Sequence, residues 1–583
     1  MKKTAVSLAF LLVAVLSAQS YALNRDAFTF VRYDLKVRVQ PAVSGMDVTG
    51  TVELRNDSKS PQKDVAMQIT STFRWLNVQA NGQPVSWLTQ PYTSDIDHTG
   101  ELSEAIVSLP SPVAPGGFIT LNVHYGGTVK EDSTRLTRIG TPQSVAFRSD
   151  WDRIGSNFTT VRGLGFVTWY PVSMDAVSLS NGTEVFDALA GWRFRHTNSQ
   201  MNLSIMANVD PGEVDKDSSI FIDCPSGGWQ PGAGFNKPAV CSFSHVGKDA
   251  PAFAISTFQQ MERPQLDVMY RAAHTQYARD YAVAAENALT TITEWFGPVK
   301  HKATIVELSD PDALPYEAGT YLFTPIKKLP QTALEVALAR VMTHSCFDSP
   351  RPWVREGLAV FAQALVREQQ EGRKAGLRYL NQFVNALAVA EDQSHAMIPN
   401  GPPGQATAVP QPLISTNDEL FLRTKAGFVW WMLRDLIGDD AMRKFIRSYN
   451  PAEDKDSGYV QRLAEAAGAH KDLEAFFDSW VYRDHLLPDF KVDSAYARKT
   501  LSNTYLVAVT VENLGDSWAE VPVVVQSAEG ERMSRIALGP KGKGIARIVI
   551  PALPTDVVVN DGSVPEANLD NNRAKVTTAD ILR

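Results

Sequence analysis

The residues best suited to metal binding or catalysis lie in one stretch of the chain, residues 339–359. This stretch contains His344, Asp348 and Glu356, which are residue types that bind Zn²⁺. It also contains Arg340, whose guanidinium stays protonated and repels cations. On a helix, residues four positions apart share one face, so Arg340 and Asp348 would both lie on the face of His344. The plain alternative is a core histidine for His344 and an exposed acid at a helix start for Glu356.

The segment W-V-R-E-G-L-A-V-F, residues 353–361, resembles the part of gluzincin peptidases that supplies their third zinc ligand. The match would make Glu356 that ligand. The resemblance is to the membrane alanyl aminopeptidases and covers about residues 28–488. It extends to four further segments: Tyr33–Tyr125, Trp169-Tyr170-Pro171, residues 315–319 and Thr424-Lys425-Ala426-Gly427. It implies a thermolysin-like domain, a zinc ion and the hydrolysis of peptide bonds.

The zinc motif of that family, H-E-x-x-H on a helix, is absent from the chain. In the family, the two histidines bind zinc and the glutamate activates the metal-bound water. In a first alignment, residues 340–344 take the place of the motif. His344 is then the second ligand, Arg340 replaces the first, and Val341 replaces the general base. Arg340 would repel Zn²⁺ and could pair with Glu356 instead.

A second alignment places residues 344–348 at the motif. His344, Asp348 and Glu356 could then still hold a zinc ion, although a serine replaces the base. Pro350 disfavours helical backbone in the residue before it, so Asp348 would lie on a fraying helix end. The first alignment is therefore favoured. Because both alignments lose the catalytic glutamate, we expect a degenerate zinc site with no secure cofactor.

Glu317 is the remaining candidate for contact with a substrate. The loop of residues 315–319 occupies the place where the family holds the free amine of its substrate, although Ala318 replaces the family's asparagine. A carboxylate there could bind an α-ammonium through a charge-assisted hydrogen bond. The alternative is a solvated loop carboxylate. The family's transition-state tyrosine should lie just before Lys425, where residues 421–423 supply no phenol.

The sequence pattern around these residues predicts a multidomain α+β protein, whose strands and helices must position them. Residues 23–255 show short alternating strands without helical runs, which is typical of a β saddle or sandwich. Residues 256–488 begin with a helical pattern over 268–295 and predict the gluzincin-like, mostly helical domain. Its helices over 331–347 and 354–370 would carry His344 and Glu356, after a strand over 319–324. Residues 489–583 alternate again and predict an immunoglobulin-like β-sandwich.

The first residues predict a secretory signal peptide, residues 1–22. Lys2 and Lys3 form a basic start, residues 5–16 are almost wholly apolar, and small residues favour cleavage after Ala22. A membrane anchor is the competing interpretation, but the apolar run is short for a bilayer span. We therefore expect a periplasmic or secreted protein with no membrane span in the mature chain.

Export makes a disulfide possible. Cys224 and Cys241 flank a loop rich in glycine and proline and could bridge it, or they could be two buried thiols. Cys346 would then be the odd thiol.

The amino-acid composition argues against one class of partner. The chain has 56 Lys and Arg against 64 Asp and Glu, a net charge of −8, which argues against nucleic-acid binding through a basic surface. We therefore expect an exported, aminopeptidase-like protein that binds a peptide or protein ligand without hydrolysing it. The alternatives are an active zinc metallopeptidase with non-standard ligands and a purely structural protein.

Overall fold

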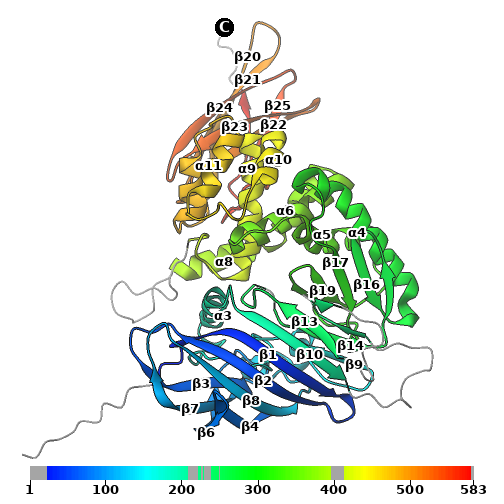
Figure 1. Ribbon diagram of the computed structural model, residues 1–583. Coiled ribbons are helices and arrows are strands. Elements are labelled where there is room, and N and C mark those ends of the chain that lie inside the picture. The colour runs from blue at the N-terminus through cyan, green and yellow to red at the C-terminus, as the bar shows by residue number, and fades with distance from the viewer. Residues whose placement is uncertain are drawn as a thin grey trace, which may run out of the picture.

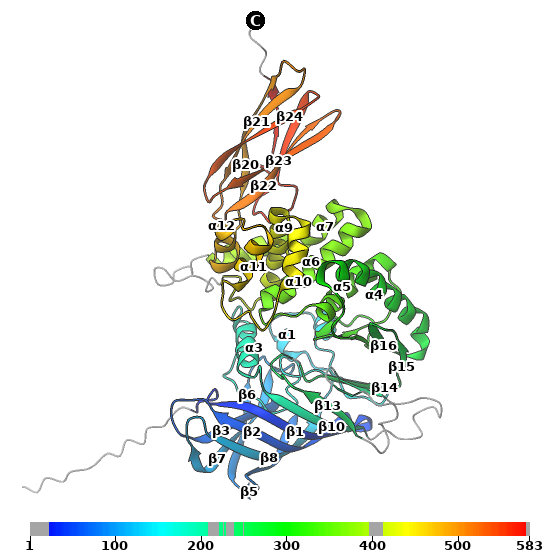
Figure 2. The same ribbon diagram turned by 45° about the horizontal axis from the view of Figure 1, so that its top comes forward.

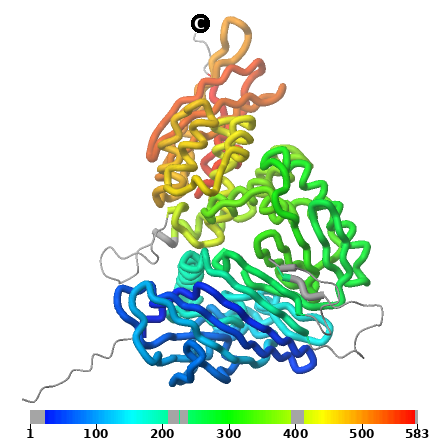
Figure 3. Tube along the Cα trace, in the orientation of Figure 1, coloured from blue at the N-terminus to red at the C-terminus, as the bar shows by residue number. Residues whose placement is uncertain are grey.

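The computed structural model describes residues 23–207, 221–224, 227–228, 238–248, 250–395 and 412–578. N-terminal sheets, a central helical region and C-terminal strands follow one another along the molecule (Figure 1). The Cα trace in Figure 3 shows that the N-terminal sheets and the C-terminal strands lie at opposite ends of the molecule. The prediction of N-terminal β structure, central helices and C-terminal β structure is confirmed at this level. The predicted signal peptide lies outside the described residues.

The N-terminal region is built on an eight-stranded sheet in the order β12-β13-β10-β1-β2-β8-β4-β5. A second sheet, β3-β7-β6, shares a hydrophobic core with it. The third sheet is β11-β14-β9. Along β1 every second side chain from Tyr33 to Val39 is buried, as the alternation in sequence predicts. The bounds are β1 Phe28–Gln40, β2 Gly45–Asn56, β3 Gln62–Thr70, β4 Phe73–Ala80, β5 Gln83–Pro84, β6 Ser86–Thr93, β7 Glu101–Val113, β8 Phe118–Thr128, β9 Phe158–Val161, β10 Gln200–Ala207, β11 Phe221–Asp223, β12 Gly227–Gly228, β13 Ala239–Phe243 and β14 Phe253–Ser256.

The expectation that this region has no helical runs is wrong. Helix α3 spans Glu184–Arg195, and two shorter helices, α1 Thr134–Arg138 and α2 Gln143–Ser149, precede it. Val185, Leu189 and Trp192 are the buried residues of α3. Their spacing of four and three residues is a helical period, which the regular strands around this segment obscured.

The central region opens with a five-stranded sheet in the order β15-β16-β17-β19-β18. Its strands are β15 Gln259–Glu262, β16 Leu266–Tyr270, β17 Ala303–Glu307, β18 Tyr316–Ala318 and β19 Tyr321–Thr324. The predicted helix over 268–295 is wrong at its start, because β16 occupies that part and α4 spans Thr275–Phe296. Parallel pairing of Leu266–Met269 with Ala303–Val306 of β17 outweighs the local helical pattern there. The strand expected over 319–324 begins later, because Gly319 has φ 62° in the turn that joins β18 to β19.

The remaining central elements are helices. Their bounds are α5 Gln331–Cys346, α6 Pro352–Glu371, α7 Arg373–Leu380, α8 Val384–His395, α9 Ala426–Ile437, α10 Asp439–Ser448, α11 Tyr459–Ala467 and α12 Glu474–Phe477, with π-helical turns η4 Phe421–Lys425 and η5 Asp478–Tyr482. Helices α6 and α9 approach closely at Gly357, where an added Cβ would lie 2.5 Å from Ala426 Cβ and 2.7 Å from Trp430 Nε1. Trp353 stacks on Trp430 in the same contact, with ring centroids 5.0 Å apart.

The C-terminal strands form two four-stranded sheets, β24-β21-β20-β27 and β23-β22-β25-β26 (Figure 2). The bounds are β20 Phe490–Lys499, β21 Tyr505–Asn513, β22 Ala519–Ser527, β23 Gly530–Leu538, β24 Lys543–Ile550, β25 Pro554–Val559, β26 Arg573–Lys575 and β27 Thr577–Thr578. The hydrophobic core of these sheets is continuous with that of the central helices. Trp480 Nε1 of η5 donates a hydrogen bond to the carbonyl of Trp518 at 2.7 Å across this junction.

Among the described residues, no helix combines the length and the apolar character needed to cross a bilayer.

We predict that Gly357→Ala lowers the melting temperature. The new methyl group would overlap Ala426 and Trp430, and overpacking of this kind typically costs about 1–3 kcal/mol. Gly191→Ala is the matched control, because Gly191 lies in α3 with no atom within 4 Å of an added Cβ. The control should leave the melting temperature unchanged or raise it through helix propensity. Equal stabilisation by both substitutions, measured by calorimetry, would show that α6 and α9 are not in close contact.

Candidate functional site

Arg340 lies between two glutamates that come from different elements. Helix α5 provides Arg340, strand β18 provides Glu317 and helix α6 provides Glu356. Arg340 Nε lies 3.1 Å from Glu317 Oε2, and Arg340 Nη2 donates a hydrogen bond to Glu356 Oε2. The contact with Glu317 lacks hydrogen-bond geometry and is an ion pair only. The three side chains are 18%, 11% and 15% exposed in the order Arg340, Glu317, Glu356, so one guanidinium compensates two largely buried carboxylates.

His344 lies one helical turn after Arg340 and faces the same two carboxylates. Its Nδ1 is 3.4 Å from Glu317 Oε2, and its Nε2 is 3.9 Å from Glu356 Oε1. Neither contact is a hydrogen bond, and both ring nitrogens are buried without a hydrogen-bond partner among the described residues. A buried polar atom left unpaired costs free energy. These nitrogens are therefore available to a ligand or a water molecule that enters the cluster.

Positive charges keep both carboxylates ionised. Burial raises the pKa of Glu317, but the interactions with Arg340 and His344 lower it by more, so the pKa lies below its ordinary value. Burial also raises the pKa of Glu356, and the charges of Arg340, His344 and two further arginines bring it far below the usual range. One of these is Arg355, whose Nε lies 3.2 Å from Glu356 Oε1. The other is Arg423 of η4.

These residues do not fit a zinc ion. Arg340 already neutralises the carboxylates that would face the metal, and it cannot deprotonate to become a ligand. Across the described ranges, no group of three or more His, Cys, Asp or Glu side chains is arranged to hold a metal. Val341, which replaces the general base in the first alignment, is a fully buried apolar side chain.

The alternative ligand set of His344, Asp348 and Glu356 is not brought together. Helix α5 ends at Cys346, so Asp348 lies beyond the helix, and it forms an ion pair with Lys248 of the N-terminal region. The position of Asp348 beyond the helix agrees with the effect expected of Pro350 and gives the second alignment no support. Ser345, its substitute for the base, is buried and donates a hydrogen bond to the carbonyl of Val341 at 3.1 Å.

Sequence reasoning missed two residues beside the cluster. Burial raises the pKa of Tyr379 in α7 to about 12, although the nearby charges of Arg340 and Arg423 lower it. The phenol therefore stays protonated and can donate a hydrogen bond. Arg423 Nη2 lies 3.2 Å from Glu419 Oε2 on the exposed side of η4. In the sequence, residues 421–423 stand out only by their lack of a phenol, and no motif marks Tyr379, which a separate helix brings to the site.

The other sequence candidates lie apart from the cluster. The structure contains a disulfide between Cys224 and Cys241. Cys346 is a buried free thiol, and burial raises its pKa to about 12. Lys425 Nζ donates a hydrogen bond to Glu391 Oε1 at 2.6 Å, with both side chains almost fully buried.

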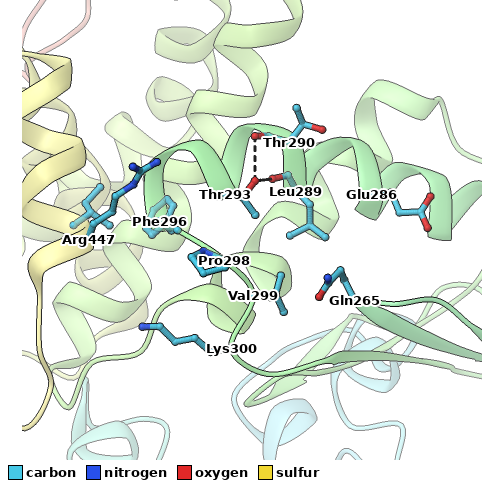
Figure 4. Close-up of a pocket in the computed structure, with 12 residues that line it drawn as sticks. Gln265, Glu286, Leu289, Thr290, Thr293, Phe296, Pro298, Val299, Lys300 and Arg447 are labelled. Carbon is cyan, nitrogen blue, oxygen red and sulfur yellow. Dashed lines mark hydrogen bonds between the residues drawn. The ribbon is translucent and has the colours of Figure 1, made fainter.

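A surface hollow of about 700 Å³ lies between α4 and α10 (Figure 4). Leu289, Thr293 and Phe296 of α4 form one side, and Lys300 and Arg447 reach it from neighbouring segments. It shares no residue with the ionic cluster. Its open shape and mixed lining give no reason to place the chemistry there, so the candidate site remains the cluster around Arg340.

No protein-family model matches the chain, and no curated protein matches it. Among solved structures, it is similar to the M1 zinc metallopeptidase from Deinococcus radiodurans, with 18% identity and a TM-score of 0.43 over 78% of this chain and 94% of that one. A two-domain M1 zinc metallopeptidase mutant bound to L-arginine has 17% identity and a TM-score of 0.43, over 79% of this chain and 96% of that one.

We predict that Arg340→Met destabilises the protein more than Glu356→Gln. Loss of Arg340 leaves the largely buried Glu317 without an arginine partner among the described residues and leaves Glu356 with Arg355 as its only arginine at ion-pair distance, whereas loss of the Glu356 charge leaves Arg340 paired with Glu317. Removing one partner of a buried ion pair typically costs about 3–5 kcal/mol, and we expect Arg340→Met to fall in this range in denaturant unfolding. Arg462→Met is the control, because its pair with Asp456 is exposed and exposed ion pairs add little to stability. The reverse order of the two site variants would contradict the arrangement.

The difference in unfolding free energy between Arg340→Met and the natural protein should decrease as the pH falls. In the natural protein the pKa values of Glu317 and Glu356 are lowered. Their stabilisation is therefore complete above the pKa of an unfolded glutamate, about 4.3, and is lost as the pH falls through the folded values. In the variant the same carboxylates lose the charge of Arg340, their pKa values rise, and protonation relieves their repulsion. The unfolding free energies of the variant and the natural protein should converge between neutral pH and about pH 5. A constant difference between them would contradict this account.

Proposed function

We propose that this chain is an exported protein of the gluzincin metallopeptidase fold whose central site binds peptides or protein segments without hydrolysing them. The observation that carries the proposal is the Arg340 guanidinium, which lies against both Glu317 and Glu356. The resemblance in sequence assigns this position to the family's metal. Hydrolysis by that family needs a cation to polarise the carbonyl and a carboxylate to activate water. Arg340 excludes the first, and the buried Val341 cannot supply the second.

Strand β18 supports peptide binding. It is the last strand of the central sheet and, among the described strands, pairs only with β19, so its other edge could accept the backbone of an extended peptide. Glu317 lies on this strand and keeps 11% of its side chain exposed despite its contact with Arg340. A peptide on that edge could place its α-ammonium against the Glu317 carboxylate. The unpaired nitrogens of His344 lie beside the same carboxylate.

Two features support export. The N-terminal sequence has the basic start, apolar stretch and small residues of a signal peptide. A disulfide links Cys224 and Cys241, and disulfides persist mainly in oxidising compartments. The thermolysin-like and immunoglobulin-like assignments of the central and C-terminal regions belong to the same proposal.

We predict that the purified natural protein contains no stoichiometric zinc. Arg340 supplies the positive charge that a metal would supply, so treatment with a chelator should leave the melting temperature unchanged. Elemental mass spectrometry of untagged protein provides the first measurement and calorimetry the second. A full equivalent of zinc that is lost on substituting His344 or Glu356 by alanine would support the active-peptidase alternative and overturn the proposal.

We predict that short peptides with a free N-terminus bind more tightly than their N-acetylated forms. Acetylation removes the ammonium that Glu317 would hold, and a single charge-assisted contact supports only weak affinity. Calorimetric titration of both peptide forms should show this difference in the natural protein. In Glu317→Gln, the free peptide should bind only as well as the acetylated one. Equal binding of both forms by the natural protein, or cleavage of either, would count against the proposal.

A further inference from the structure

Helix α3 carries an unusual amount of exposed aromatic surface. Phe194 is 83% exposed and Phe186 is 41% exposed, although both belong to a well-formed helix. The guanidinium of Arg193 is also exposed and has no hydrogen-bond or ion-pair partner among the residues that the structure describes. By contrast, Arg195 on the same helix pairs with Asp26 at 2.6 Å. Exposed apolar surface beside an uncompensated charge marks α3 as a candidate contact surface.

Contacts on two sides fix the position of α3 beside the central region. On one side, an added Cβ at Gly165 would lie 3.3 Å from Leu189 of α3. The neighbouring Phe166 ring packs edge-on against Tyr316 of β18, with centroids 5.2 Å apart. On the other side, Asp187 of α3 accepts a hydrogen bond from Asn417 Nδ2, just before η4, at 3.0 Å. Figures 1 and 2 both show α3 at the boundary between the N-terminal sheets and the central helices.

Three of the exposed residues of α3 occupy one arc of the helix surface, together with the half-buried Ala190. At 100° per residue, Arg193, Phe186, Ala190 and Phe194 follow one another around the axis over about 100°. Asp187 lies next after Phe194 and contacts Asn417. The charge of Arg193, at the other limit of the arc, lowers the pKa of Tyr316, which burial raises more strongly. The arc therefore faces the space between β18 and the segment that precedes η4.

Strand β18 presents its two faces to different surroundings. Successive side chains of a strand point to opposite faces. Glu317 points to Arg340, whereas Tyr316 points to Phe166 and the α3 side. A peptide paired with the free edge of β18 would have the same alternation. Every second side chain would face the ionic cluster, and the others would face α3.

We propose that the arc of α3 formed by Phe186, Ala190, Arg193 and Phe194 reads alternate side chains of an extended peptide held on the edge of β18. The inference rests on the proposed function and names the ligand that the site selects. The occupant is an extended peptide segment with two side chains on the face that points to α3. One is large and apolar and packs on Phe186 and Phe194, and the other is acidic and pairs with Arg193. The unpaired guanidinium selects the acidic side chain by charge, because no carboxylate among the described residues compensates it.

The test uses a host peptide of serine and glycine with a free N-terminus, in which a single leucine is moved along the N-terminal positions. Calorimetric affinity for the full-length protein should alternate with leucine position, with a difference of about tenfold between neighbouring positions. Phe194→Ser and Phe186→Ser should abolish the alternation. Phe383→Ser is the matched control, because Phe383 in η3 (Asn381–Phe383) is 58% exposed and lies on another element.

The charge contact is tested with a second peptide pair, which carries glutamate or glutamine at a favourable position. Arg193→Gln should remove the preference for glutamate, and Arg195→Gln should retain it. Affinities that do not alternate, or that alternate equally in the phenylalanine variants, overturn the inference while the effect of N-acetylation still supports the proposed function. Alternation without an effect of acetylation supports the α3 surface and overturns the amine-binding role of Glu317. The absence of any peptide binding overturns both.

Discussion

The candidate site depends on one electrostatic constraint, the compensation of two largely buried carboxylates by the guanidinium of Arg340. Glu317, Arg340 and Glu356 come from a strand and two helices, so the ion pairs join three elements at one point. Loss of the central charge would leave like charges facing each other away from solvent. The planar guanidinium suits this position because its nitrogens can contact carboxylates in different directions, which a lysine ammonium does less well.

The sequence predicted the helices that carry the site better than it predicted their surroundings. Helix α5 follows the predicted range of 331–347 closely because its apolar spacing and Pro330 define it locally. The contact of Arg340 with Glu317 could not be read from spacing, since the two residues share no local periodicity. It depends on the sheet order that puts β18 at an edge. The helix predicted over 268–295 failed at its start for the same reason, because parallel pairing with β17 is a long-range property.

The strands around α3 show a different limit of sequence analysis. The buried residues of α3 have a clear helical period, but they lie in a region in which most segments alternate as strands do. A prediction made region by region assigns such a segment to the majority class. The exposed Phe194 and Arg193 gave no signal either, because single exposed aromatic and basic residues are common on any surface. Their shared direction becomes visible only when the contacts of Leu189 and Asp187 fix the rotation of the helix.

The continuous core that joins the central helices to the C-terminal sheets has a consequence for how the chain loses its structure. The boundary that the sequence suggests near residue 489 separates helices from strands, yet apolar side chains on both sides belong to one cluster. Trp480 and Trp518 are held together there. Elements packed into one core open only at a high free energy, so a shared core couples their unfolding. The C-terminal sheets and the central helices should therefore melt together. The eight-stranded sheet and the β3-β7-β6 sheet have a separate core and can open separately, whereas β9 and β14 also pack against the central sheet.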